Sequence, residues 1–360
     1  MIDMERMNGA DMKSIVFRAD ANPEIGMGHI MRCLSIADAF SGDYNVLFIL
    51  ADKSPAKIIS DRGYESMVLG SDYRNPDDEE AFWPKEITPD IIIVDSYFVT
   101  DDYMSFLRKR CGILVYVDDL IEHPFKVDVV INYNAYADAE KYQNLYEKAG
   151  IDEPKLMIGT DYVPLRSDFY NVPNKITSPE VKDVLISTGG ADPMHLAIDM
   201  VKALSSDDDK KFNFHFLIGA MNSDKKEIYS ASEGKANVII HENVRDMRAL
   251  ISSMDIILSA SGSTLYEVCA CGIPLITFVM ADNQILGADS FDKRGLAVFA
   301  GDLRNEKRED RANLLLEKIY HVSDDYQLRK SMAETMRKLV DGQGARKIVQ
   351  VLSDIERSSN

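Results

Sequence analysis

A histidine stands in a glycine-rich turn near the start of the chain, in the segment Gly26-Met27-Gly28-His29. A β-branched run precedes this turn and apolar residues at helical spacing follow it, so the turn is expected to join the first strand to the first helix. Glycine at positions 26 and 28 permits a close ligand approach that a Cβ would block. The positive end of a helix dipole favours a neutral imidazole. We therefore predict that His29 is a general base.

Other interpretations of this turn stay open. The histidine could simply cap the helix or pack locally. The turn does not match the dinucleotide-binding fingerprint, because Gly-x-Gly is followed by His29 and Met31 with no third glycine at the expected place. A Rossmann dehydrogenase is therefore disfavoured.

Two loops in the second half of the chain could hold an anion. The double glycine in Ser187–Asp192 follows a predicted strand and could cradle an anion on backbone N–H groups, although a glycine pair alone is a weak signal. The segment Ser259–Thr264 also follows a predicted strand and places hydroxyl and N–H groups at a helix start, which suits a diphosphate. The predicted diphosphate-binding residues are Gly189, Gly190, Ser261, Gly262, Ser263 and Thr264.

Three further polar residues of the second half, Glu267, Asn283 and Gln284, could contact a nucleotide sugar. Glu267 lies one helical turn after Ser263, where its carboxylate could accept hydrogen bonds from ribose hydroxyls. It could equally be a capping-box glutamate that pairs with the helix start. Asn283 and Gln284 follow the next predicted strand, and they either cap a helix or bond to a sugar or phosphate.

The elements that must position these residues alternate regularly along the chain. Continuous apolar runs such as Ile91–Asp95 suit parallel strands buried on both faces, and amphipathic stretches such as 101–109 separate them. We predict an α/β fold with two doubly wound, Rossmann-like domains that face one another across a cleft. In the first half the expected strands are 14–18, 46–50, 66–69, 91–95, 113–117 and 127–132. In the second half they are 184–187, 212–218, 238–241, 256–259, 274–279 and 297–300.

Changes of composition give the domain boundaries. We expect an N-terminal extension over 1–12, a sugar-binding and catalytic domain over 13–172, a nucleotide-binding domain over 180–340, and a last helix over 341–360. The linker is placed where the chain becomes polar and rich in proline, around 165–180. The acid-rich segment 72–80 is interpreted as a solvated loop.

Bulk composition excludes several functions. The formal net charge of −18, with no stripe of Lys and Arg, makes nucleic acid an improbable partner. The cysteines are scattered, so neither a zinc site nor a disulfide framework is expected, and we predict no metal and no organic cofactor. Without an apolar run long enough for a membrane span and without a signal peptide, the protein is expected to be cytoplasmic.

The ordered motifs resemble the PseG/SpsG family of UDP-sugar hydrolases, within the GT-B-fold group related to the MurG glycosyltransferase. The resemblance begins near Lys13 and departs from the family pattern at Ser96, where a histidine is frequent. The matching motifs are Arg18-Ala-Asp20, Gly26–Arg32, Asp95-Ser96-Tyr97, Val117-Asp118-Asp119, Leu165-Arg166, Ser187–Asp192, Ser259–Glu267 and Asn283-Gln284.

The resemblance implies hydrolysis of UDP-2,4-diacetamido-2,4,6-trideoxy-β-L-altropyranose to UDP and the free sugar, on the route to pseudaminic acid or a related surface polysaccharide. Water would attack the anomeric carbon with inversion and without a metal. His29 would activate that water, and Tyr97 and Asn283 would place the water or the sugar. The loop Ser261–Thr264 with the double glycine would stabilise the departing diphosphate, and Glu267 would hold the ribose. The remaining substrate-binding residues would be Arg18, Asp20, Gly28, Arg32 and Gln284.

Two alternatives remain. An inverting MurG-like glycosyltransferase would use the same UDP cradle and would need an exposed apolar or basic patch for a lipid-linked acceptor. The first half of the sequence offers no obvious patch of this kind, which modestly favours water as the acceptor. A non-enzymatic module that binds sugar nucleotides would tolerate the loss of His29.

Overall fold

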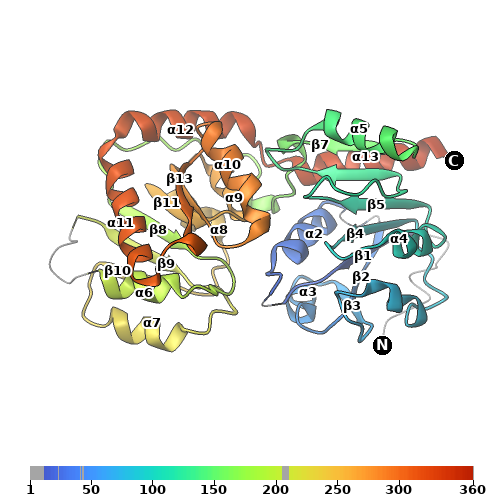
Figure 1. Cartoon of the computed structure of the whole chain (residues 1–360), viewed down its shortest axis with the longest axis horizontal. Helices are drawn as coiled ribbons and strands as arrows, with labels where there is room; N and C mark the ends of the chain where they lie inside the picture. The colour runs from blue at the N-terminus through green and yellow to red at the C-terminus, as the bar shows by residue number, and fades with distance from the viewer. Residues whose placement is uncertain (1–11, 23, 41, 43, 205–210, 360) are drawn as a thin grey trace. The chain divides into compact units, whose positions relative to one another are not determined.

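The computed structural model describes residues 12–22, 24–40, 42, 44–204 and 211–359. The chain forms two compact units, one made of Met1–Ser167 and Gln343–Asn360 and the other of Asp168–Gly342. Each unit is a parallel sheet with helices packed on it (Figure 1). The predicted fold class, two doubly wound α/β units, is confirmed. The predicted extension over 1–12 lies outside the described residues, except for Met12.

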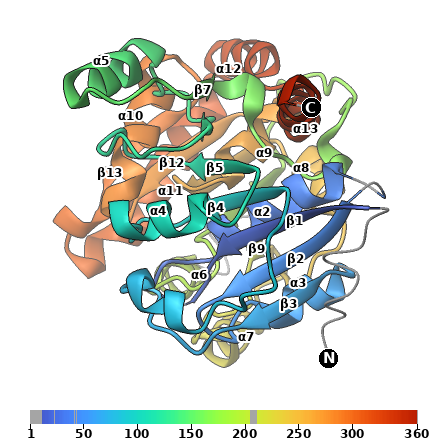
Figure 2. The same cartoon turned by 90° about the vertical axis from the view of Figure 1, so that its right-hand side faces the viewer.

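The first unit has a seven-stranded sheet in the order β3-β2-β1-β4-β5-β6-β7, with parallel neighbours throughout. Figure 2 shows β3, β2, β1, β4 and β5 side by side in this order. The chain order reverses between β1 and β4, so their carboxyl ends lie where open α/β sheets bind ligands. The strands are β1 (Lys13–Ala19), β2 (Tyr44–Leu50), β3 (Glu65–Val68), β4 (Ile91–Asp95), β5 (Ile113–Val117), β6 (Val129–Asn132) and β7 (Lys155–Ile158).

Helices connect these strands and cover the sheet. The α-helices are α2 (Gly28–Ala39), α3 (Ala56–Asp61), α4 (Asp101–Arg108), α5 (Ala139–Ala149) and α13 (Gly344–Ser359), and the 3-10 helices are η1 (Pro76–Ala81), η2 (Thr160–Tyr162) and η3 (Ser167–Phe169). The last of these, η3, straddles the boundary with the second unit.

The last helix returns to the first unit and does not form a separate piece. Glu356 on α13 accepts hydrogen bonds from Lys13 at 2.7 Å and from the Tyr44 hydroxyl at 2.6 Å. Lys347 pairs with Asp161 at 2.9 Å. These contacts join the end of the chain to β1, β2 and η2. The boundary between the units falls between residues 167 and 168, whereas the sequence places the linker over 165–180.

The second unit has a six-stranded parallel sheet in the order β10-β9-β8-β11-β12-β13, and its chain order reverses between β8 and β11. Its strands are β8 (Asp183–Ser187), β9 (Asn213–Leu217), β10 (Val238–His241), β11 (Ile256–Ala260), β12 (Leu275–Val279) and β13 (Val298–Asp302). Its helices are α6 (Leu196–Ala203), α7 (Lys225–Ser232), α8 (Met247–Ser253), α9 (Thr264–Cys271), η4 (Asp282–Gln284), α10 (Ile285–Lys293), η5 (Leu303–Asn305), α11 (Arg308–Asp324) and α12 (Tyr326–Leu339).

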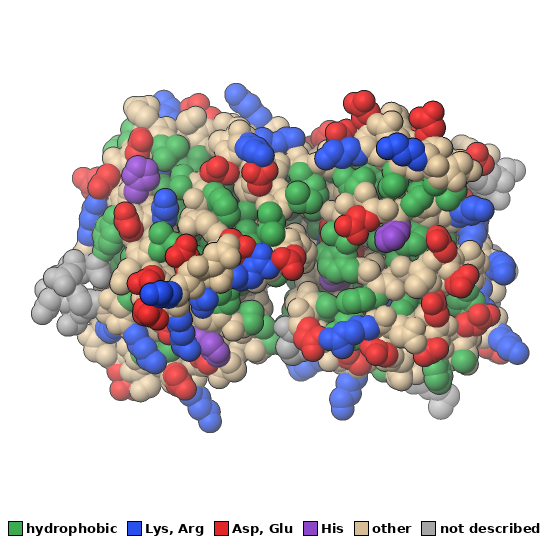
Figure 3. All heavy atoms as spheres, in the orientation of Figure 1, with side chains coloured by type: hydrophobic (Ala, Val, Ile, Leu, Met, Phe, Trp, Pro, Cys, Tyr) green, Lys and Arg blue, Asp and Glu red, His purple; other side chains and the backbone are tan. Residues whose placement is uncertain are grey.

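On the face drawn in Figure 3, lysine and arginine side chains are scattered among acidic ones on each unit. In the described part of the chain, every helix falls short of the length and apolar character needed to cross a membrane.

The acid-rich segment 72–80 differs from its prediction as a solvated loop. Part of it forms η1, and Glu79 is 0% exposed. Its carboxylate accepts hydrogen bonds from Arg18 Nε and Nη2 at 2.7 and 2.5 Å, and from the hydroxyls of Ser71 and Tyr103. A buried carboxylate is tolerated when it is paired and fully hydrogen-bonded in this way. One acidic residue therefore anchors the segment to the end of β1.

This anchor predicts a large difference between two adjacent glutamates. Glu79→Ala leaves Arg18 buried without its main partner, so the free energy of unfolding should fall by about 3 to 5 kcal/mol. Glu80 is exposed, and Glu80→Ala should change it by less than about 0.5 kcal/mol. Urea unfolding of both variants measures the difference. Equal values for the two would show that the Arg18 pair does not hold this segment.

Candidate active site

The turn that carries His29 is held by its own backbone and by one asparagine. Asn22 Oδ1 accepts hydrogen bonds from the N–H groups of Glu24 and Ile25, and the N–H of Gly26 donates to the carbonyl of Asn22 at 2.8 Å. Gly26 has a φ of +76°, a conformation that glycine adopts without strain. A Cβ on Gly28 would have no heavy atom within 4 Å, so this side of the turn is open to a ligand. The predicted role of these glycines fits this local geometry.

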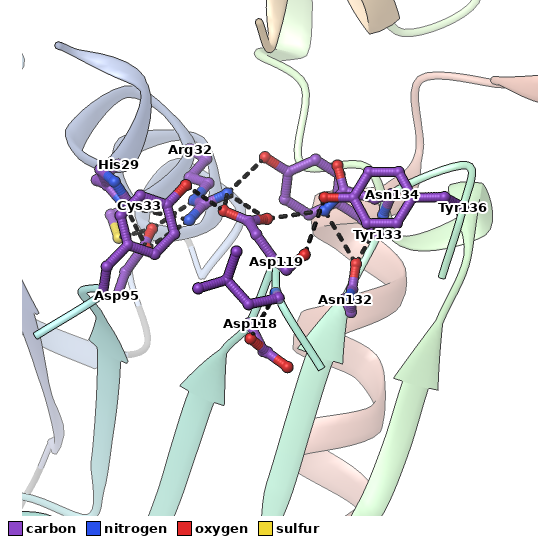
Figure 4. Close-up of polar contacts among 12 residues, drawn as sticks. His29, Arg32, Cys33, Asp95, Asp118, Asp119, Asn132, Tyr133, Asn134 and Tyr136 are labelled. Atoms are coloured by element: carbon purple, nitrogen blue, oxygen red, sulfur yellow. Dashed lines mark hydrogen bonds and ion pairs between the residues drawn. The ribbon is translucent and has the colours of Figure 1, made fainter. Parts of the chain in front are cut away.

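His29 lies in the first turn of α2 and is 5% exposed. Its Nδ1 lies 2.6 Å from Oδ1 of Asp95, the last residue of β4 (Figure 4). Burial alone would raise the pKa of Asp95, but the positive charge of Arg32 and the contact with His29 outweigh burial and lower this pKa well below its usual range. Asp95 is therefore a carboxylate that can only accept, so Nδ1 donates to it. In the neutral ring, Nε2 is left as the proton acceptor.

Arg32 lies one helical turn after His29 and contacts the carboxylates of both Asp95 and Asp119. Its Nε and Nη2 donate to the two oxygens of Asp95, each at 2.5 Å. Its Nη1 donates to the Asp119 carboxylate at 2.9 and 3.0 Å and to the Tyr133 hydroxyl at 2.8 Å. Its guanidinium is buried and paired with two carboxylates, so it holds Asp95 and Asp119 in place. Its predicted contact with substrate stays a prediction.

Tyr97 lies beside His29, as the sequence predicts for a shared site. The two rings meet edge to face, with their centroids 4.6 Å apart. The Tyr97 hydroxyl donates to Asp119 Oδ2 at 2.8 Å, and Asn134 Nδ2 donates to Asp119 Oδ1 at 2.7 Å. One connected network therefore joins α2 to residues at the carboxyl ends of β4, β5 and β6.

A small hollow lies against His29. Asp20, His29, Asp95, Tyr97 and the aromatic rings of Tyr73 and Phe98 are among its lining residues. Its volume is about 10 Å³, close to what a single water molecule needs. The hollow thus offers room for about one water molecule next to the histidine.

Arg18 and Asp20 are both held by contacts within the protein, and their predicted substrate-binding role stays a prediction. Arg18 is 1% exposed and pairs with Glu79 and with Asp20, the latter at 2.5 Å. The other oxygen of Asp20 accepts from the N–H of Ala51 at 2.7 Å. Both side chains are therefore used to join β1 to its neighbours. Asp20 still borders the hollow, but its two oxygens are already bonded.

In the second unit, the loop after β11 divides into buried and exposed parts. The Ser261 hydroxyl donates to the carbonyl of Phe278 at 2.9 Å and lies 2.6 Å from the hydroxyl of Thr277. Its N–H donates to the same carbonyl. Ser261 therefore attaches the loop to β12, and its predicted role in binding diphosphate stays a prediction. Gly262 and Ser263 are exposed and Thr264 is half-buried, so these three stay candidates at the start of α9.

Glu267 is half-buried in the first turn of α9, which keeps it beside the candidate loop. The N-cap residue Ser263 makes no side-chain capping hydrogen bond, so its half of the alternative capping box is not formed. The ribose-binding role of Glu267 stays a prediction.

The double glycine lies at the end of β8 and packs against the loop after β9. Gly189 has a φ of +86°, and the carbonyl of Gly190 accepts from the N–H of Met221 at 3.1 Å. A Cβ on Gly219 would lie 2.3 Å from that carbonyl, so the two loops approach as closely as glycine allows. Asp192 caps the start of α6 by accepting from the N–H groups of Leu196 and Ala197. A protein carboxylate therefore occupies this helix start.

Asn283 and Gln284 lie on η4, after β12. Asn283 is exposed, in agreement with a role in binding. Gln284 Oε1 accepts from the N–H of Met280 at 2.8 Å, so its carbonyl oxygen stabilises the turn. The substrate-binding role of Gln284 stays a prediction.

The structure adds residues that sequence reasoning did not assign. These include Asp95, the last residue of β4, and Asp119, two residues after β5, and the carboxyl ends of parallel strands favour ligand binding. Tyr73, on the acid-rich segment, had no sequence signal. Among the described residues, no three His, Cys, Asp or Glu side chains are grouped so that they could hold a metal ion.

The lowered pKa of Asp95 predicts a pH-dependent contribution to stability. Since the folded-state pKa lies below the unfolded value near 4, this contribution is complete at neutral pH and is lost as the pH falls through the acid range. Asp95→Asn should therefore flatten the decline of unfolding free energy between pH 5 and pH 3. Asp61→Asn changes an exposed aspartate and should leave the decline as it is. Urea unfolding at several pH values would measure it, and identical slopes for all three proteins would contradict the assignment.

Three relatives align with most of the chain. The uncharacterized protein MJ1062 of Methanocaldococcus jannaschii is 27% identical over 78% of this chain, and the alignment spans 58% of that protein's length. The spore coat polysaccharide biosynthesis protein SpsG of Bacillus subtilis is 24% identical over 94% of this chain and 97% of its own. A UDP-2,4-diacetamido-2,4,6-trideoxy-β-L-altropyranose hydrolase of Campylobacter jejuni is 26% identical over 79% of this chain and 98% of its own.

Solved structures agree on the fold. The MurG structure of Acinetobacter baumannii gives a TM-score of 0.61 at 13% identity, covering 95% of this chain and 99% of that one. The UDP-GlcNAc 2-epimerase of Neisseria meningitidis, solved with UDP-GlcNAc bound, gives 0.64 at 15% identity over 95% and 100%. Residues 184–351 match the glycosyltransferase family 28 C-terminal domain. The chain is therefore a homologue of SpsG and of the altropyranose hydrolase, with a GT-B-type fold related to MurG.

Proposed function

We propose that this protein hydrolyses a UDP-linked 2,4-diacetamido-2,4,6-trideoxy sugar to UDP and the free sugar. The observation that carries the proposal is the His29–Asp95 pair beside a hollow with room for about one water molecule. The name of the Campylobacter jejuni relative supports this choice of substrate. The product sugar would serve pseudaminic acid or related surface-polysaccharide synthesis.

The proposed step is a direct displacement by water. The water oxygen forms a bond to the anomeric carbon while one of its protons passes to His29 Nε2. The bond between that carbon and the diphosphate oxygen breaks, and its electron pair leaves with UDP. His29 then returns the proton to solvent. The step uses only protein groups, and a base in this position contributes about 10²- to 10⁴-fold in rate.

The charges around His29 suit this transfer. Asp95 and Asp119 carry two negative charges and Arg32 carries one positive charge, so the buried group has a net charge of −1 when His29 is neutral. Protonation of His29 brings the sum to zero. A fixed environment that matches the charge developing in the reaction lowers the barrier without reorganisation during the step.

Residues of both units contribute to the proposal. Tyr97 would bind the attacking water, and Asn283 would bind the water or the sugar. The loop from Ser261 to Thr264 at the start of α9, together with Gly189 and Gly190, would bind the diphosphate through main-chain N–H groups and hydroxyls. Glu267 would hold the ribose.

The second candidate is a UDP-sugar glycosyltransferase. The match of residues 184–351 to the glycosyltransferase family 28 C-terminal domain favours it, because this domain family is named after glycosyltransferases. The two functions differ only in what attacks the anomeric carbon. A transferase passes the sugar to an alcohol, and a hydrolase passes it to water.

Substitution of the proposed base tests the mechanism. His29→Ala should lower kcat for UDP release by at least about 100-fold while UDP affinity stays within a few-fold. His123 is an exposed histidine of the same unit, and His123→Gln should keep the activity of the parent protein. Steady-state UDP release and calorimetric UDP binding give the two quantities. Full turnover by the His29 variant would refute the assignment.

The acceptor is tested directly. Purified protein with the UDP-altropyranose derivative should release UDP and free sugar in equal amounts without any added alcohol. Mass spectrometry in ¹⁸O-labelled water should find the label in the sugar, since water attacks carbon, and not in UDP. If release needs an added acceptor, the protein is a transferase.

A further inference from the structure

The Tyr97 hydroxyl donates its proton to the carboxylate of Asp119, which has no proton to donate in return. Asp119 is buried, and its two oxygens receive hydrogen bonds from Arg32 Nη1, Asn134 Nδ2 and the Tyr97 hydroxyl at 2.7 to 3.0 Å. Arg32 and the Asn134 amide are donors at these contacts, so the carboxylate accepts at every one of them. Tyr97 therefore donates to Asp119, and its phenol oxygen can offer only a lone pair to any further partner.

The same reasoning applies to His29. Asp95 takes the Nδ1 proton, so Nε2 of the neutral ring also offers a lone pair. A water that bonds to both side chains must then donate one proton to each. Its own lone pairs are left to face away from these two acceptors, which is the orientation that an attacking nucleophile requires.

We propose that Asp119 is a positioning residue that orients the attacking water by making Tyr97 a hydrogen-bond acceptor. This inference rests on the proposed hydrolysis. It adds the direction of the two hydrogen bonds that the water makes with His29 and Tyr97. Arg32 ties the two acceptors together, because its guanidinium binds Asp95, which orients His29, and Asp119, which orients Tyr97. One buried cation thus sets the direction of both hydrogen bonds to the water.

The neighbouring residue Asp118 is also an aspartate, but its position gives it different partners from those of Asp119. Asp118 accepts from the N–H groups of Leu120 and Ile121 and from the Tyr142 hydroxyl, and burial raises its pKa. It closes the turn after β5, in a different part of the network in Figure 4. Only Asp119 of this pair contacts Arg32 and Tyr97.

Asp119→Asn is the test, because it reverses one hydrogen bond with little change in shape. The amide oxygen of the new side chain takes the place of Oδ1, where it accepts from Asn134 and Arg32, and its NH₂ takes the place of Oδ2, where it faces Tyr97 and gives up the second contact with Arg32 Nη1. The phenol then accepts from the amide and points its own proton at the water. We expect kcat for UDP release to fall about 10- to 100-fold, with KM within about twofold.

A double-mutant cycle separates this role from general support of the fold. Tyr97→Phe removes the acceptor, so it should lower kcat by a similar factor, and the double variant should be no slower than the slower single variant. Tyr136 donates to the main-chain carbonyl of Asp119 at 2.9 Å and not to its carboxylate. Tyr136→Phe is therefore the matched control and should keep kcat within about twofold. Thermal unfolding identifies any variant that fails to fold.

The possible results are distinct. If Asp119→Asn keeps kcat within twofold, or if the effects of the two single changes multiply in the double variant, Asp119 does not act through Tyr97 and the inference is overturned. If Asp119→Asn does not fold, the Tyr97→Phe variant decides alone, and unchanged kcat in it overturns the inference. If the parent protein releases no UDP without an acceptor, the hydrolase function itself fails and the water site with it.

Discussion

The buried guanidinium of Arg32 between two carboxylates is the interaction on which the rest of the first unit's site depends. Burial of charged groups costs several kcal/mol for each ion unless the partners are close and their hydrogen bonds are complete. Here the fork of the guanidinium meets Asp95 on one side and Asp119 on the other. Because any displacement would leave a charge buried without its partner, the end of β4, the residues after β5 and the first turns of α2 are held in one arrangement.

A second buried ion cluster supports the other side of the turn. Arg18, at the end of β1, pairs with Asp20 and with Glu79. These pairs fix the chain just before the glycine turn. They also attach the segment that carries Tyr73, a residue that lines the hollow. The glycine turn thus lies between two clusters of buried, hydrogen-bonded ion pairs. These clusters hold the chain on both sides of His29, which borders the hollow.

The second unit uses backbone groups where the first uses charged side chains. Its described candidates for anion binding are main-chain N–H groups and hydroxyls at the start of α9, and Ser261 fastens that loop to β12. Fixed N–H groups attract a diphosphate whatever the net charge of the protein. The proposed function assigns proton transfer to the first unit and anion binding to the second.

The sequence alone determined the α/β class and the strand and helix order, because apolar periodicity and glycine turns are local signals. It also gave His29, Tyr97 and the loop before α9 as candidates, because they follow strand ends. Only the tertiary structure showed that Arg32 faces two carboxylates, that Glu79 is buried in an acidic segment, and that Ser261 bonds to a neighbouring strand. The partners of Arg18 and Arg32 lie 60 or more residues away and those of Ser261 on the next strand, so neither carries a local signal. Residue type does not show which polar groups are already paired within the protein, because that depends on charge pairing in three dimensions.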